Sequence, residues 1–135
     1  MHELNGLEAP SLEDLDALAA DAYARLPRAF HELTGNVIIR IEDFPDDDVL
    51  RDMKAESEFD LLGLFQGVGL AHGEELAHTG ALPNMVFLYR RPILDYWAEH
   101  KESLGAIVAH VLIHEIGHHF GLSDDDMARL ESEVA

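Results

Sequence analysis

Cysteine is absent from this 135-residue chain, so neither disulfide bonds nor thiolate metal ligands are available to it. No apolar run reaches the roughly 18 residues that a membrane-spanning helix needs. The first ten residues lack the basic start and apolar block of a secretory signal. We therefore expect a cytoplasmic protein that has no membrane partner.

Basic residues are also scarce. The chain has 9 Lys and Arg residues against 27 Asp and Glu residues, a formal net charge of −18. A negative field of this size repels phosphate backbones and anionic membrane surfaces. Nucleic acid is therefore not an expected partner, whereas solubility and cation binding are favoured.

The residues that are present fit one globular domain. Hydrophobic residues make up 47% of the chain, and its length suits a single ordinary core. No internal repeat or low-complexity linker divides the sequence. We expect one domain over residues 1–135, with residues 1–10 flexible.

Apolar spacing and turn formers predict the elements of this domain. A helix is expected after the capping residue Ser11, and Pro27 divides it into two pieces that end near Gly35. Residues 37–41 are nearly all β-branched and apolar, which predicts a central strand buried on both faces. The other expected elements are helices at 48–56, 92–101, 104–120 and 124–133, strands at 61–68 and 84–89, and a long loop at 69–83 that carries His72 and His78.

The helix at residues 104–120 is apolar around most of its circumference, as buried helices are. Within it, His114, Glu115 and His118 spell His-Glu-x-x-His. Residues four apart lie on one face of a helix, so the two imidazoles can converge on one point beside the carboxylate. Two neutral imidazoles and a neighbouring base are what a catalytic zinc ion requires.

A simpler explanation is that these are two core histidines bonded to backbone carbonyls, with Glu115 paired to one of them. However, three titratable groups within five residues of an apolar helix would cost several kcal/mol to bury without partners. A bound dication removes that cost and explains why the three groups occur together. We therefore predict a metal site.

A third ligand is expected just beyond this helix. Gly121 lets the chain reverse direction, and Asp124, six residues after His118, can then bring a carboxylate to the metal. Asp125 and Asp126 are adjacent, weaker candidates for the same role. The complete pattern is His-Glu-x-x-His-x-x-Gly-x-x-Asp.

This pattern resembles the extended motif of the metzincin zinc peptidases, with aspartate in place of their usual third histidine. The methionine turn of those enzymes has no counterpart in the 11 residues after Asp124, and Met127 is expected to pack in the core. From about Leu15 to Leu130, the order of strands and motifs is similar to the small bacterial minimal-zincin family, often described as possible zinc metallopeptidases.

The resemblance implies an α+β, reduced zincin-like fold: a small mixed sheet of about three strands, a buried active-site helix and flanking helices. It implies one zinc ion held by His114, His118 and Asp124, with Glu115 as the general base of peptide-bond hydrolysis. The expected partner is a peptide or protein substrate. In such folds a substrate extends along an edge strand, for which residues 61–68 are the candidate.

Several neighbouring residues have weaker expectations. His110 and His119 are expected either to support the ligands or to pack in the core, and Arg90 and Arg91 to pair with acids of this chain. The glycines of residues 61–68 either leave room for a peptide or only make room for a packed helix.

Two other functions remain open. The chain is also compatible with a regulatory metalloprotease that cleaves one specific protein partner. From a different class, it is compatible with a non-catalytic interaction module in which zinc is a structural staple. Glu115 argues against the staple, because a structural site has no use for a base.

Overall fold

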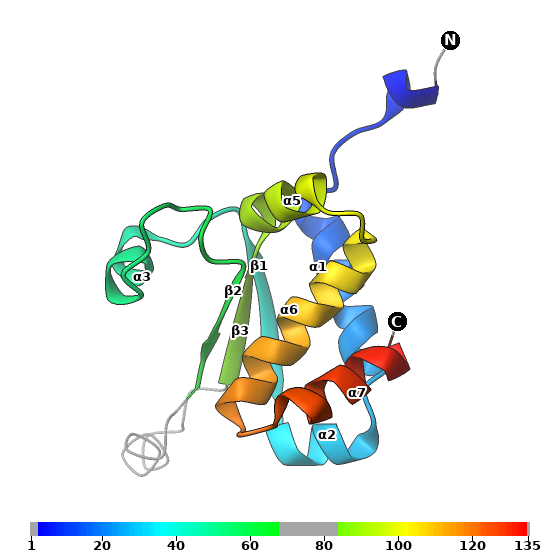
Figure 1. Cartoon of the computed structure of the whole chain (residues 1–135), viewed down its shortest axis with the longest axis vertical. Coiled ribbons are helices and arrows are strands. Elements are labelled where there is room, and N and C mark those ends of the chain that lie inside the picture. The colour runs from blue at the N-terminus through cyan, green and yellow to red at the C-terminus, as the bar shows by residue number, and fades with distance from the viewer. Residues whose placement is uncertain (1–2, 68–83, 135) are drawn as a thin grey trace.

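The computed structural model describes residues 3–67 and 84–134. Its elements form a small α+β fold, as expected (Figure 1). In chain order they are η1 (Glu3–Gly6), α1 (Leu12–Ala24), α2 (Arg28–Thr34), β1 (Val37–Glu42), α3 (Asp47–Asp52), β2 (Gly63–Gln66), β3 (Asn84–Tyr89), α5 (Arg90–Glu99), α6 (Leu104–His119) and α7 (Asp124–Val134). The loop expected at residues 69–83 lies outside the described residues.

The three strands form a mixed sheet in the order β1-β3-β2. β1 pairs in parallel with β3, and β2 pairs with β3 in the antiparallel direction. The prediction of a central strand at residues 37–41 is therefore wrong: β3 is central, and β1 is an edge strand among the described residues. Burial alternates along β1, and Ile38 is 41% exposed, because β-branched residues favour a pleated surface even on its outer face.

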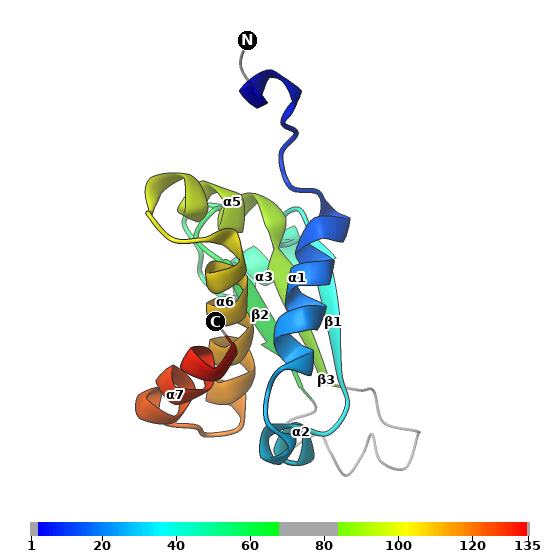
Figure 2. The ribbon, with the colours of Figure 1, turned by 90° about the vertical axis from the view of Figure 1, so that its right-hand side faces the viewer.

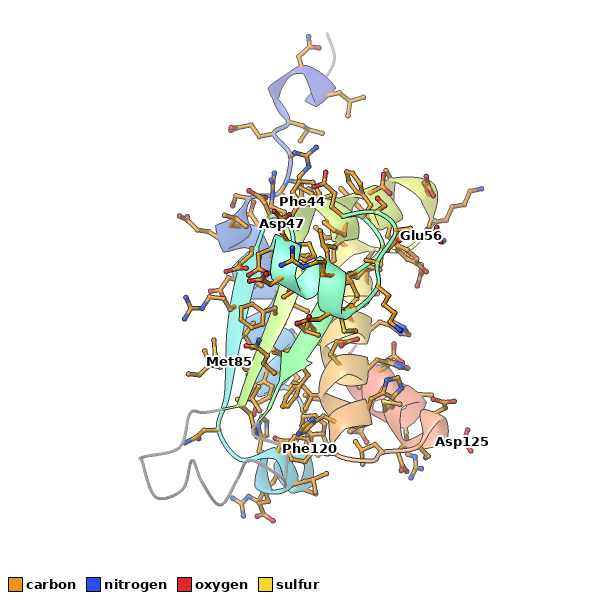
Figure 3. The ribbon with its side chains drawn as sticks, turned by 90° about the vertical axis from the view of Figure 1, so that its left-hand side faces the viewer. Phe44, Asp47, Glu56, Met85, Phe120 and Asp125 are labelled. Carbon is orange, nitrogen blue, oxygen red and sulfur yellow. The ribbon has the colours of Figure 1, made fainter. Side chains whose placement is uncertain are left out.

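Helices α1 and α6 pack together against one face of the sheet, α1 over β1 and α6 over β2 and β3 (Figure 2). The short helix α3 lies across one end of the opposite face (Figure 3). The fully buried side chains at the centre come from the sheet and both helices, among them Leu15, Val86, Leu88, Leu112 and Ile116. The fold thus has two main layers, the sheet and the helices α1 and α6 that cover one of its faces.

Local sequence explains where the helices begin and end. The Ser11 side chain and Asp14 form a reciprocal capping box at α1, and Ser103 accepts a hydrogen bond from the Ala106 N–H at 3.1 Å to begin α6. Helix α6 is followed by Gly121, whose φ of 77° is the left-handed conformation predicted for it. The chain then turns back, and α7 packs on α6.

The inward face of α7 is also as expected: Met127 is completely buried and packs in the core. Among the described residues, no helix has both the length and the apolar character to span a membrane.

Candidate metal centre

Helix α6 places His114, Glu115 and His118 on the part of the helix that packs beside strand β2. The rings of His114 and His118 are nearly perpendicular, with centroids 5.7 Å apart, as expected for residues one turn apart. His114 and Glu115 are half-buried, whereas His118 is exposed. The two imidazoles therefore lie on one face of the helix, at the boundary between core and solvent.

Glu115 is held in an environment that favours its protonated form. Burial raises the pKa of this carboxyl above its ordinary value of 4.5, and the nearby His118 opposes the shift by lowering it. A carboxylate with a raised pKa binds a proton more strongly than an exposed one does. The site therefore improves Glu115 as a general base.

A pocket of about 260 Å³ opens beside these residues. One wall is formed by the start of β2 and the residues before it, and the other by α6. The lining residues are Asp60, Leu61, Leu62, Gly63, His110, Val111, His114 and Glu115. His114 and Glu115, the first two residues of the His-Glu-x-x-His motif, thus line the same pocket as the start of strand β2.

Gly63 explains how α6 approaches β2 so closely. A Cβ atom at this position would lie 2.8 Å from Val111 Cγ1, 3.0 Å from the Phe87 carbonyl oxygen and 3.2 Å from Glu115 Cγ. Of the two explanations considered for the glycines, room for a packed helix is the correct one at Gly63. β2 nevertheless lies at the edge of the sheet among the described residues, as predicted.

Sequence reasoning missed Glu131, which approaches His114 from α7. Its Oε2 accepts a hydrogen bond from His114 Nε2 at 3.1 Å, and its Oε1 accepts one from His110 Nδ1 at 2.5 Å. Among the described residues, these three side chains form the cluster of possible metal ligands whose donor atoms all lie within 4.8 Å. The available signal was spacing: Glu131 lies four residues after buried Met127, so it faces α6.

The three aspartates after Gly121 occupy the first turn of α7. Asp124 and Asp125 are exposed there, and Figure 3 places Asp125 on the outer side of the turn. Ser123 and Asp126 form a reciprocal capping box at the start of α7: Ser123 Oγ accepts a hydrogen bond from the Asp126 N–H at 3.1 Å, and Asp126 Oδ2 accepts one from the Ser123 N–H at 3.2 Å. Those bonds lower the Asp126 pKa. Asp124 is not in the cluster around Glu131 and remains a predicted ligand.

The donor atoms at this end of α6 suit a zinc ion. Imidazole nitrogens and carboxylate oxygens are its usual ligands when cysteine is absent. His114 and His118 offer imidazole nitrogens from successive turns of α6, and Glu131 of α7 brings a carboxylate oxygen to 3.1 Å from His114 Nε2. The residues present therefore fit the metal that the motif predicts.

The other residues considered from the sequence have structural partners. His119 packs on Phe65, with ring centroids 4.2 Å apart, and so supports the contact between α6 and β2. Arg90 forms an ion pair with Asp43 at 3.0 Å, as expected, and Arg91 lies over the Phe44 ring at 5.5 Å. Neither arginine is part of the pocket beside Glu115.

Comparison with known proteins supports a family assignment for the chain. A search of curated proteins finds no match to the chain. The profile of the family described as zincin-like metallopeptidase matches residues 34–134, which includes the whole sheet, α6 and α7. The description of that family implies a bound metal ion, and zinc is the metal that its name indicates. The chain belongs to the zincin-like metallopeptidase family.

Proposed function

We propose that this protein is a zinc-dependent metallopeptidase that hydrolyses peptide bonds, with His114, His118 and Asp124 as metal ligands and Glu115 as general base. The observation that carries the proposal is the position of Glu115. It is half-buried, adjacent in sequence to His114, and lines a pocket at the edge strand of the sheet. A zinc site without catalysis has no need of a carboxylate in such a position.

When bound, zinc supplies an acidic water molecule and polarises the scissile carbonyl group. The Glu115 carboxylate would act as the base for the attacking water, holding the proton that it removes and passing it to the leaving amine. Burial of Glu115 suits both steps, since a raised pKa strengthens the base and keeps the proton available for transfer. Helix α6 is fixed against the sheet by its buried face, so the carboxylate is held in place before substrate binds.

The proposed substrate lies extended along β2. The Tyr89 N–H donates to the Leu62 carbonyl oxygen at 2.9 Å, and antiparallel pairing alternates along the strand. The backbone groups of Gly63 and Phe65 therefore point away from β3, toward the edge at which no further strand is paired among the described residues. A peptide paired with that edge would pass the pocket that Glu115 lines, which is the geometry of strand addition.

The test compares the zinc-loaded wild type with Glu115→Gln on an unstructured peptide mixture, with cleavage followed by mass spectrometry. Glu99→Gln is the matched control, because Glu99 is an exposed acid at the end of α5. We expect cleavage by the wild type and the control, and a rate lower by about 10²–10⁴ in Glu115→Gln. Zinc analysis should find equal metal in all three proteins.

Equal cleavage by the wild type and Glu115→Gln at equal zinc content would exclude the proposed base. Zinc bound without any cleavage, together with unfolding when a chelator removes it, would favour the structural staple. Removal of zinc from the wild type should abolish peptide cleavage, and adding zinc back should restore the cleavage.

A further inference from the structure

The upstream cluster, defined here as His110, His114 and Glu131, has the composition of a metal site in its own right. The rings of His110 and His114 are stacked, with centroids 4.0 Å apart. Each imidazole uses a different oxygen of the same carboxylate, at 2.5 and 3.1 Å. Two imidazoles and one glutamate are a ligand set that zinc uses in proteins while keeping a fourth position open.

We propose that the upstream cluster binds a divalent transition metal ion such as Zn²⁺ or Co²⁺. The site lies one helical turn before the His114–His118 pair and shares His114 with it. Because the cluster uses Nε2 of His114, a metal held there competes with a metal bound through that nitrogen at the proposed catalytic site. The proposal does not depend on peptidase activity.

The distances support this assignment. In a tetrahedral zinc site with bonds of 2.0–2.1 Å, neighbouring ligand atoms are about 3.3 Å apart. His110 Nδ1 lies 2.5 Å from Glu131 Oε1, and His114 Nε2 lies 3.1 Å from Glu131 Oε2. With one ligand atom taken from each of the three residues, all three atoms lie within 4.8 Å of one another. Small side-chain rotations would therefore open the cluster around an ion. A ligating nitrogen must be unprotonated, so Nδ1 of His110 and Nε2 of His114 would carry no hydrogen in the metal-bound form.

Access and charge also favour a cation at this position. The side chain of His110 is 55% exposed, and those of Glu131 and His114 are 27% and 23% exposed. An ion can therefore enter from solvent without the opening of the core. The chain carries a net charge of −18, and the acidic first turn of α7 lies on the same helix as Glu131.

The two sites can be separated by substitution. The double variant His118→Ala/Asp124→Ala removes two of the three proposed catalytic metal ligands and keeps the whole upstream cluster. The double variant His110→Ala/Glu131→Gln removes two ligands of the upstream cluster and keeps the proposed catalytic ligands. His114→Ala removes a ligand from both. Zn²⁺ affinity is measured by competition with a chromogenic chelator, and Co²⁺ coordination by its absorption spectrum, after circular dichroism has shown that each variant is folded.

We expect His118→Ala/Asp124→Ala to bind one Zn²⁺ per chain and to give a Co²⁺ spectrum. Adding His110→Ala to this variant should weaken Zn²⁺ binding by more than about 10–100-fold, which is the effect of losing a residue that only hydrogen-bonds to a metal ligand. His114→Ala should bind weakest. The proposal is overturned if His118→Ala/Asp124→Ala binds Zn²⁺ no better than His114→Ala, whether or not the wild type cleaves peptides.

Wild-type protein provides a second measurement that needs no variant. Zn²⁺ is titrated into protein labelled with ¹⁵N, and the ring signals of His110 are followed. Because His110 stacks on His114, a small change is expected from either site; a shift of the His110 Nδ1 signal to that of a metal-bound nitrogen supports the upstream site. If the His110 signals stay unchanged while those of His118 respond, up to two equivalents of Zn²⁺, then the metal binds only at the His114–His118 pair and the proposal is overturned.

Discussion

Gly63→Ala tests the packing that places the edge strand beside the active-site helix. The added Cβ would lie 2.8 Å from Val111 Cγ1 and 3.0 Å from the Phe87 carbonyl oxygen. The carbonyl belongs to the neighbouring strand, so it cannot move without disturbing the sheet. Overpacking of this kind costs about 1–3 kcal/mol, and the lower entropy of the unfolded alanine chain offsets about 0.4–1 kcal/mol of it.

The expected net loss is therefore about 1–2 kcal/mol, which corresponds to a Tm lower by about 3–10 °C for a chain of this size. Thermal and urea unfolding, followed by circular dichroism, measure it. Gly105→Ala is the matched control, because a Cβ there meets only Leu18 Cδ2 at 3.8 Å and alanine favours a helix. If Gly63→Ala is as stable as Gly105→Ala, then β2 and α6 are not packed as described.

Three further predictions concern stability. Met127→Ala should lower the free energy of unfolding by about 2–5 kcal/mol in urea titrations, because Met127 is fully buried where α7 packs on α6. Ser103→Ala should cost about 1 kcal/mol in the same assay through loss of the α6 cap, and Ser103→Asp should restore most of it. In metal-free protein, Glu115 should destabilise the fold as pH rises from 4.5 through its raised pKa, because the folded state keeps a proton that the unfolded state has lost. The stability of Glu115→Gln relative to wild type should thus increase over that pH range; a constant difference would contradict the assigned burial.

The catalytic candidates were recognisable because their pattern is local. His114 and His118 lie on one face of a helix whatever surrounds them, since helical spacing alone sets their relation. Gly121 could be assigned a left-handed cap for the same reason, and it has that conformation. The capping residues Ser11 and Ser103 were also predictable, since a cap depends on a few consecutive residues.

Strand order was harder to predict. The apolar run in β1 indicated a strand correctly, but it did not show that the strand lies at an edge, with Ile38 facing outward. Pairing depends on contacts between segments far apart in the chain, and the β propensity of a residue depends on the strands it packs against, so it does not by itself tell an edge strand from a central one.

The sequence by itself determined a buried helix with two histidines and a glutamate correctly spaced for a metal, and a reversal of the chain after it. Only the tertiary structure decided which carboxylate reaches His114. Glu131 is distant in sequence and becomes its partner because burial of Met127 fixes how α7 lies on α6. Helix geometry sets relations within a few residues, whereas the meeting of two helices is set by the packing of their apolar faces.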